Sequence, residues 1–362
     1  MATKFLDSAD AAASPNEPVL NAAKISPVNS AEVVKAQAVA PPATSTGMSA
    51  LVAKIASMDL AGIAKSLAVP LFGIVAFLAL WAVLAPQVDT SLGSLPGPAE
   101  VAEQGVSLYD EWAATQADKA AFYDAQDARN SAAIAASQPV QNFEYSGSPT
   151  FLDQILTSLK TVALGFFLAT LVAVPLGLIC GLSKTFNAAI NPLVQIMKPV
   201  SPLAWLPIVT MVISATITSA DPALPKAFVI SAIVVMLCSL WPTLINTTVG
   251  TASIDKDLLN VGKVLRLGWF AKLTKLVLPS ALPYIFTGMR LSLGVGWMVL
   301  IAAEMLAQNP GLGKFVWDEF QNGSSQSLAR IMFAVIVIGL IGFLLDRLMM
   351  MLQDFANRNH AI

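Results

Sequence analysis

Few residues of this chain could do chemistry inside an apolar environment. Arg290 is the single charge in an apolar run from Leu276 to Ala303, and Glu304 follows fourteen residues after Arg290. Fourteen residues are close to four helical turns, so on a helix both side chains point to a similar side. A lone cation at membrane depth needs a cavity or a partner. We predict that Arg290 attracts a passing oxyanion, or else snorkels or forms a structural ion pair, and that Glu304 has a structural role at its helix end.

Trp205 is a third candidate, because Pro202 and Pro207 flank it in an uncharged run. A proline-broken helix can free backbone carbonyls that line a pathway, and it can equally be a fixed kink. Arg290, Glu304 and Trp205 are therefore the predicted residues of a translocation pathway.

The chain offers little material for catalysis. It has one histidine, His360, and two cysteines, Cys180 and Cys238, both inside apolar runs. These residues cannot build a histidine-based catalytic centre or a Cys/His zinc site. The phosphate-binding pattern Gly-x4-Gly-Lys-Ser/Thr is absent as well. We predict no catalytic residue, no metal and no cofactor, and we expect any ATP hydrolysis in a separate chain.

A basic, amphipathic stretch at residues 253–278 interrupts the apolar C-terminal half. The stretch contains five basic residues and two acidic ones, and leucines and valines recur between them at helical spacing. Asp255 or Asp257 can cap the first turn. We predict a docking helix from Leu258 to Leu267 that ends at Gly268. We expect a second short helix to end at Pro279, where the chain turns into the next apolar run.

This stretch resembles the cytoplasmic loop of permease subunits in binding-protein-dependent ABC importers. The family loop carries Glu-Ala-Ala, then a glycine, then Ile-x-Leu-Pro. Here Asn260-Val261-Gly262 replaces Glu-Ala-Ala, Gly268 matches the glycine, and Val277-Leu278-Pro279 matches the last motif. The segments LPYIFTGMR, GWMVLIAAEML and SPLAWLPIV resemble the nitrate, taurine and aliphatic-sulfonate branch, with nitrate permeases the most similar.

The resemblance implies a type I ABC importer permease that forms a homodimer with the pathway between the copies. It implies ABC ATPase subunits docked on the loop and a periplasmic solute-binding protein that delivers a small oxyanion. Nitrate is the first expectation, and nitrite, cyanate, bicarbonate, taurine and alkanesulfonates are alternatives. Transport would proceed by alternating access. The coupling-loop residues that it implies are Asp257, Leu258, Leu259, Asn260, Val261, Gly262, Leu265, Gly268 and Pro279.

Composition indicates the elements that must position these residues. Of 362 residues, 56% are apolar and only 12% charged, whereas about a quarter of a soluble domain is charged. About 20 apolar residues suffice to span a bilayer as a helix. We predict an all-α polytopic membrane protein with six transmembrane helices. The corresponding runs are 66–85, 161–183, 199–220, 227–254, 276–303 and 331–345.

The second of these runs carries a ridge of small residues. Ala173, Gly177 and Gly181 recur every four residues. Small residues on one ridge let two membrane helices approach closely. We predict that this ridge is a packing surface rather than a ligand site.

The placement of Lys and Arg favours cytoplasmic N- and C-termini in a bacterial inner membrane. The outer segment could dock a periplasmic partner or be a solvated insertion. We predict a disordered tail (1–50), a juxtamembrane segment (51–65), a first span (66–85), a periplasmic insertion (86–158), a five-helix core with the coupling loop (159–352), and a C-terminus (353–362).

Two other classes of function fit the sequence less well. A secondary transporter would need a titratable relay in the membrane and an inverted repeat, and neither is evident. A membrane-embedded enzyme would need a nucleophile with a base, or a metal cluster. The bilayer is an expected partner, and nucleic acid is not.

Overall fold

The computed structural model describes residues 60–90, 93–218 and 224–358. The chain divides into two units, Met1–Ala68 and Val69–Ile362. Of the first unit only the start of helix α2 is described. The predicted tail (1–50), most of the juxtamembrane segment (51–65) and the last C-terminal residues (359–362) lie outside the described residues.

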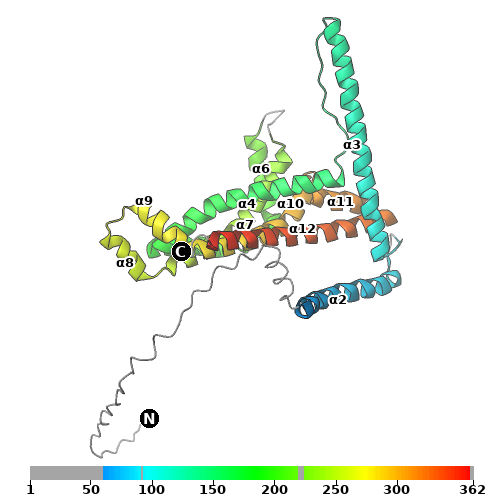
Figure 1. Cartoon of the computed structure of the whole chain (residues 1–362). Coiled ribbons are helices and arrows are strands. Elements are labelled where there is room, and N and C mark those ends of the chain that lie inside the picture. Colours follow the sequence, from blue (N-terminus) through cyan, green and yellow to red (C-terminus); the bar gives the residue numbers. More distant parts are fainter. Residues whose placement is uncertain (1–59, 91–92, 219–223, 359–362) are drawn as a thin grey trace, which may run out of the picture. The chain divides into compact units, whose positions relative to one another are not determined.

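The described part of the chain is almost entirely helical (Figure 1). Its one sheet there is a two-stranded antiparallel ladder that pairs Asp89 with Ser94. The elements are α2 (Leu60–Leu84), η1 (Ala85–Gln87), β1 (Asp89–Thr90), β2 (Gly93–Ser94), α3 (Pro98–Ala135), α4 (Phe151–Leu182), α5 (Lys184–Met197), α6 (Pro202–Thr216), α7 (Lys226–Ala252), α8 (Lys256–Val264), α9 (Trp269–Lys272), the π-helical turn η2 (Leu273–Val277), α10 (Leu278–Ala307), α11 (Leu312–Asn322) and α12 (Ser325–Arg358).

Helices α4 and α7 pack closely and run parallel. Gly177 lies against Thr247, and one turn further along both helices Gly181 lies against Thr251. The same sequence offset separates both pairs, which only parallel helices allow. A Cβ atom at Gly177 would come within 2.6 Å of Thr247 Cβ, so small residues are needed for this close approach. The predicted packing ridge is confirmed.

Helix α10 packs against both α7 and α12 and is antiparallel to each. Gly250 of α7 lies against Tyr284 of α10, whereas the earlier α7 residue Asn246 lies against the later α10 residue Gly288. On the α12 side, Trp297 Nε1 donates to the Ile338 carbonyl at 3.0 Å. The core helices therefore all run between the same two ends of the core. We call the end with α8 and α9 the coupling end, and the end with α3 and α11 the arm end.

Five helical segments are long and apolar enough to span a membrane, and α5 with α6 forms a sixth candidate bent by 102°. Because α4 and α7 run parallel, the chain between them must cross back, so the bent pair completes six spans. The predicted count is confirmed. Within the third predicted run, 199–220, the helix is α6, and a break after Met197 separates it from α5, which lies before that run.

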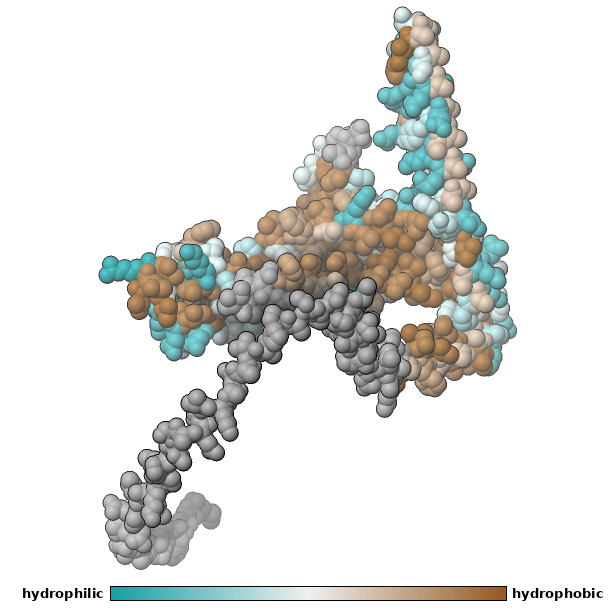
Figure 2. All heavy atoms as spheres, viewed as in Figure 1, coloured by the Kyte–Doolittle hydropathy of each residue, from teal (hydrophilic) through white to brown (hydrophobic). Residues whose placement is uncertain are grey.

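Helix α4 begins at Phe151, inside the predicted outer insertion, where Thr150 caps it by accepting from Asp153 N. The insertion itself is mostly a single helix, α3, followed by a returning segment at residues 136–149. Figure 2 shows hydrophobic side chains over the core helices and hydrophilic ones on α3 and near α8. The insertion therefore forms an arm with many hydrophilic side chains, whereas the core carries the apolar spans.

Candidate functional site

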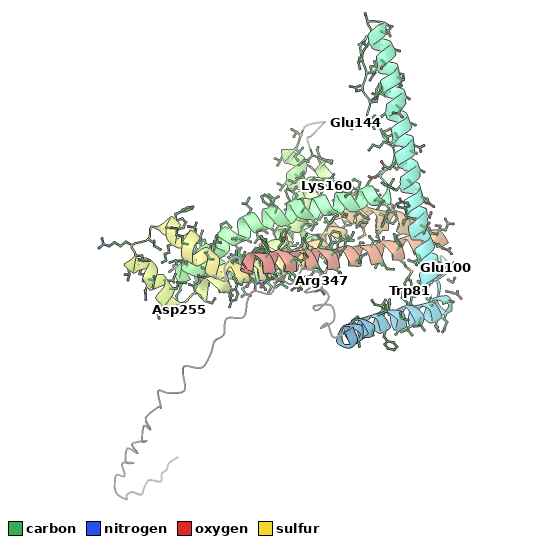
Figure 3. All side chains as sticks on the ribbon, viewed as in Figure 1. Trp81, Glu100, Glu144, Lys160, Asp255 and Arg347 are labelled. Atoms are coloured by element: carbon green, nitrogen blue, oxygen red, sulfur yellow. The ribbon has the colours of Figure 1, made fainter. Side chains whose placement is uncertain are left out.

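Helix α8 begins at Lys256, two residues before the predicted start at Leu258, and one of the two predicted residues caps it. Asp255 Oδ1 accepts from the Asp257 backbone N–H at 2.9 Å, which satisfies one of the free amides of the first turn. Figure 3 shows Asp255 at the coupling end, whereas Glu144 and Glu100 lie on the arm. The predicted capping by Asp255 or Asp257 is thus resolved in favour of Asp255.

The end of α8 differs from the prediction. The helix stops at Val264, and Arg266 takes a left-handed conformation with φ 49°. Leu267 N donates to Gly262 O and Arg266 N donates to Lys263 O, both at 3.0 Å. These two bonds are those of a Schellman motif, so Arg266 occupies the position that glycine normally takes. Nothing local in the sequence marks an arginine for this role.

Gly268, expected to end α8, instead caps the start of α9 with φ −60°. No described atom lies within 4 Å of a Cβ built there, so neither backbone nor space requires glycine at this position. Its match to the family motif is therefore not explained by packing within this chain.

The chain does not turn at Pro279. Helix α9, the π-helical turn η2 and α10 form one helical stretch from Trp269 to Ala307, with Pro279 in the first turn of α10. A proline collides with the carbonyl four residues before it in a regular helix. We attribute the π-helical turn just before Pro279 to relief of that collision. The coupling segment is consequently continuous with the helix that carries Arg290 and Glu304.

The inner face of α8 packs on the core. Leu259 contacts an apolar cluster formed by the ends of α4 and α7 and the start of α10. A Cβ at Gly262 would lie 2.7 Å from Leu276 Cδ1, so the close approach of α8 needs a small residue or a shifted leucine. The cluster consists of Leu178, Ile254, Val277, Ala281 and Ile285.

The outer face of α8 and α9 is apolar, and the described residues leave it uncovered. Val264 is 81% exposed, Trp269 69% and Phe270 72%. Three predicted residues, Leu258, Val261 and Leu265, are also exposed there. Helical spacing from Val261 could have identified Val264, whereas no sequence pattern indicated that Trp269 and Phe270 remain uncovered. We call the following set the docking face: Leu258, Val261, Val264, Leu265, Trp269 and Phe270.

Arg290 has a charged partner that the sequence analysis missed. Its Nε and Nη2 donate to Asp346 Oδ1 and Oδ2 at 2.5 and 2.8 Å. The pair joins α10 to α12 and is about two-fifths exposed on each side. A groove of about 400 Å³ between the two helices ends at this pair, with Gly294 and Gly339 in its wall.

Glu304 is fully buried and serves as the centre of a polar cluster. Ser158 Oγ donates to its carboxylate at 2.8–2.9 Å, Gly313 N at 3.0 Å and Asn309 Nδ2 at 3.4 Å. Ser158 Oγ also accepts from Leu312 N at 2.8 Å. Glu304 therefore ties α4, the α10–α11 turn and α11 together, whereas Arg290 contacts α12.

Ser292 joins α10 to α7 through contacts that the sequence analysis did not predict. Pro242, inside α7, lacks the N–H of a regular helix. Beside it, Thr243 N donates to Ser292 Oγ at 3.1 Å, and Ser292 Oγ donates to the Ser239 carbonyl. In a regular helix Thr243 and Ser239 would pair with each other. A hydroxyl from α10 thus lies in the hydrogen-bond ladder of α7, a known cause of helix kinks.

The structure does not gather the three predicted pathway residues into one site. Fourteen residues of α10 separate Arg290 from Glu304, a distance of about 21 Å along the helix. Trp205 lies on a different element, α6. Its indole Nε1 is buried and has no hydrogen-bond partner among the described residues. Trp205 therefore differs from the other two, whose polar groups are already engaged within the chain.

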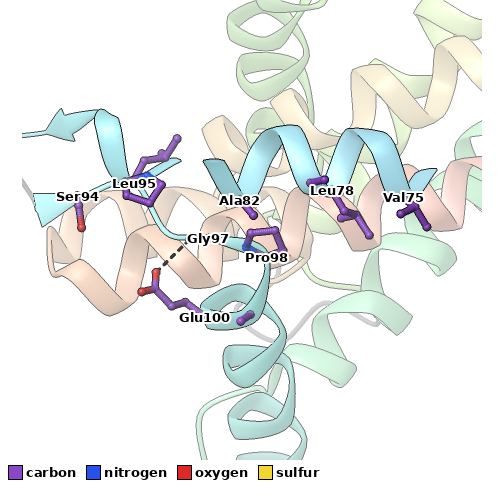
Figure 4. Close-up of a pocket in the computed structure, with 11 residues that line it drawn as sticks. Val75, Leu78, Ala82, Ser94, Leu95, Gly97, Pro98 and Glu100 are labelled. Atoms are coloured by element: carbon purple, nitrogen blue, oxygen red, sulfur yellow. Dashed lines mark hydrogen bonds between the residues drawn. The ribbon is translucent and has the colours of Figure 1, made fainter. Parts of the chain in front are cut away.

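A cavity of about 590 Å³ lies between α2 and the start of α3 (Figure 4). Its wall is mostly apolar, with Val75 and Leu78 from α2. The carboxylate in its wall, Glu100, already accepts from Gly97 N at 3.0 Å. The cavity includes none of the predicted pathway or coupling residues.

Comparison with known proteins places these features in a family. Residues 173–358 match the family model "Binding-protein-dependent transport system inner membrane component". A nitrate import permease, NrtB, of Synechocystis sp. is 37% identical over 201 residues, which cover 56% of this chain and 68% of that protein.

Two bicarbonate transport permeases named CmpB are also similar. That of Synechococcus elongatus is 39% identical over 207 residues, 57% of this chain and 69% of that protein. That of Synechocystis sp. is 33% identical over 283 residues, 77% of this chain and 84% of that protein. The chain therefore belongs to the inner membrane permease family of binding-protein-dependent ABC importers, whose multi-pass members are transport subunits that work with a separate ATPase and a binding protein.

Proposed function

We propose that this chain is the permease of an ATP-driven importer that moves nitrate across the inner membrane. The support for the importer class is the uncovered docking face on a short helix that is packed against the core. The support for nitrate is the 37% identity to a nitrate import permease. Both termini lie in the cytoplasm in this proposal, as the Lys and Arg placement favours.

The docking face supplies the contact with the ATPase. Burying a side chain such as Leu, Val or Phe contributes about 1.5–3 kcal/mol, so several exposed apolar residues on one short segment can hold a grooved partner. Leu259 and Gly262 on the opposite face press against the core. A displacement of α8 by the ATPase would then move α10 as a rigid body, because η2 continues directly into it.

The permease works as a homodimer in this proposal, with the pathway between two copies. Arg290, Glu304 and Trp205 stay predictions as pathway residues. The contacts of Arg290 and Glu304 supply each with a structural role, and the indole N–H of Trp205 is suited to donate to an oxyanion. Asp257, Asn260 and the other predicted loop residues stay predictions as residues of the ATPase-coupling loop, and of these Leu259 and Gly262 face the core.

Bicarbonate is the second candidate substrate, because the CmpB permeases are as similar to this chain as NrtB is. Nitrate and bicarbonate are both small planar monoanions. A helical pathway recognises such ions by the same charge and hydrogen-bond acceptors, so we expect the binding protein to choose between them.

The test is uptake of nitrate and of bicarbonate by the source organism with and without this gene, with taurine as a control. Loss of nitrate uptake alone is the expected result. Loss of bicarbonate uptake alone would identify bicarbonate, and not nitrate, as the substrate. Flux through the purified chain without an ATPase would contradict the importer class.

A further inference from the structure

The arm, residues 98–149, has a stiff construction. Helix α3 is backed by the returning segment, in which Phe143 N donates to Gln126 Oε1 at 2.6 Å and Asn130 Nδ2 donates to Asn142 Oδ1 at 2.8 Å. The rings of Phe122 and Tyr145 pack edge to face. The arm therefore keeps its direction beyond the core.

The base of the arm is fixed to the core by an arginine. Arg330 of α12 donates to Gln104 and to Glu319 at 3.3 Å, and also to Glu111. Leu108 of α3 is buried in the main core cluster. From Glu111 to the end of α3 at Ala135 the helix extends about 36 Å at its usual rise, which is about the diameter of a small domain. The arm is thus long enough to reach a neighbouring molecule.

The arm crosses the ends of the spanning helices at a steep angle rather than continuing their direction (Figure 1). Since α4, α7, α10 and α12 cross the bilayer, the arm lies along the membrane surface and reaches sideways. A neighbour in the plane of the membrane is therefore its natural contact.

The surface of the arm is suited to a protein contact. Ile134 is 66% exposed and Val140 45%, and both lie near the turn at residues 136–137 that forms the tip. Phe143, 54% exposed, lies further down the arm beside Gln126. Eight acidic residues against two basic ones make the arm repel anionic lipid headgroups. The acidic residues are Glu100, Glu103, Asp110, Glu111, Asp118, Asp124, Asp127 and Glu144.

A second copy of this chain offers the complementary charge. Lys160 in α4 and Lys226 at the start of α7 lie toward the arm end of the core, and neither forms an ion pair within residues 60–90, 93–218 and 224–358. We infer that each arm reaches over the arm end of the second permease copy, with its tip on the partner and its acidic side near these lysines. In a two-fold dimer both arms would do so at once.

This inference rests on the homodimer of the proposed function but not on its substrate. The first test measures the dimer fraction of the full-length chain in detergent by native mass spectrometry, without ATPase, nitrate or binding protein. The tip variant Ile134→Ser with Val140→Ser should raise the dimer dissociation constant at least about tenfold. The control Val106→Ser, a similarly exposed valine near the base of the arm, should leave it unchanged.

A second measurement covers the case in which the core alone holds the dimer. Both native cysteines are first replaced, by Cys180→Ala and Cys238→Ala. Two differently tagged chains, one with Phe143→Cys and one with Lys160→Cys, are then co-expressed and treated with a bifunctional maleimide. A crosslinked product that carries both tags is expected. The control pair, Val106→Cys with Lys160→Cys, should give none.

The doubly tagged product supports the inference even where the core sets the dimer fraction. Its absence would overturn the inference, whatever the tip variant does to the dissociation constant. A photo-crosslinker at Phe143 that captures only lipid, or only the binding protein, would overturn it too. Failure of nitrate uptake with an intact crosslink would instead contradict the proposed substrate alone.

Discussion

The two ends of helix α10 are built in opposite ways. At the arm end, Glu304 is buried and hydrogen bonds from Ser158, Gly313 and Asn309 hold it. At the coupling end, α10 continues through a π-helical turn into a segment whose apolar side chains are exposed. One end is therefore fixed within the chain, whereas the other leaves apolar side chains uncovered by the described residues.

The largest expected effect is at the fixed end. Glu304→Ala removes the acceptor of the Ser158 hydroxyl, the Gly313 amide and the Asn309 amide, and an unsatisfied buried donor costs about 1–3 kcal/mol. We expect at least about 3 kcal/mol lower stability and loss of folded protein in size-exclusion chromatography. Glu304→Gln keeps one acceptor oxygen and should lose less. An unchanged melting temperature for Glu304→Ala would show that this end is not fixed by the cluster.

The next effect concerns the link between α7 and α10. Ser292→Ala leaves the Thr243 amide and the Ser239 carbonyl without the bridging hydroxyl, which should cost about 1–3 kcal/mol. The matched control is Ser231→Ala, since Ser231 is also fully buried but its hydroxyl has no partner in the described part of the chain. The measurement is thermal unfolding in nanodiscs. Equal losses for both variants would contradict the bridging role.

A smaller effect is expected midway along α10. Arg290→Gln breaks the pair with Asp346, which is about two-fifths exposed on each side, and such pairs contribute about 1 kcal/mol or less. Arg290→Gln with Asp346→Asn should be no less stable than either single variant, with Arg347→Gln as control. Nitrate uptake by the double variant separates the roles: retained uptake assigns Arg290 to structure, and lost uptake assigns it to the pathway.

The smallest effect on stability is expected at the coupling end, together with loss of function. Val264 is 81% exposed, so Val264→Asp should change stability by less than about 0.5 kcal/mol. It places a charge in the middle of the docking face, and we expect loss of ATPase co-purification and of uptake. Val106→Asp on the arm is the matched control. Normal ATPase binding by Val264→Asp would remove the docking assignment.

The sequence alone predicted the features that depend on the local pattern of residues. Uncharged runs predicted six spans, since a helix in lipid satisfies its own backbone and needs only apolar side chains. The four-residue spacing of Ala173, Gly177 and Gly181 predicted a packing ridge, and α7 occupies it. The cap at Asp255 followed from the preference of a short carboxylate for free backbone amides.

Only the tertiary structure shows which residues far apart in the sequence contact each other. Asp346 lies one residue beyond the predicted end of the sixth run, and it pairs with Arg290 because α10 and α12 are antiparallel. Ser158 reaches Glu304 across 146 positions. Arg266 takes the left-handed position because the end of α8 must satisfy its carbonyls between fixed elements. These contacts depend on helix register and on pairing across the chain, which no local spacing of residues encodes.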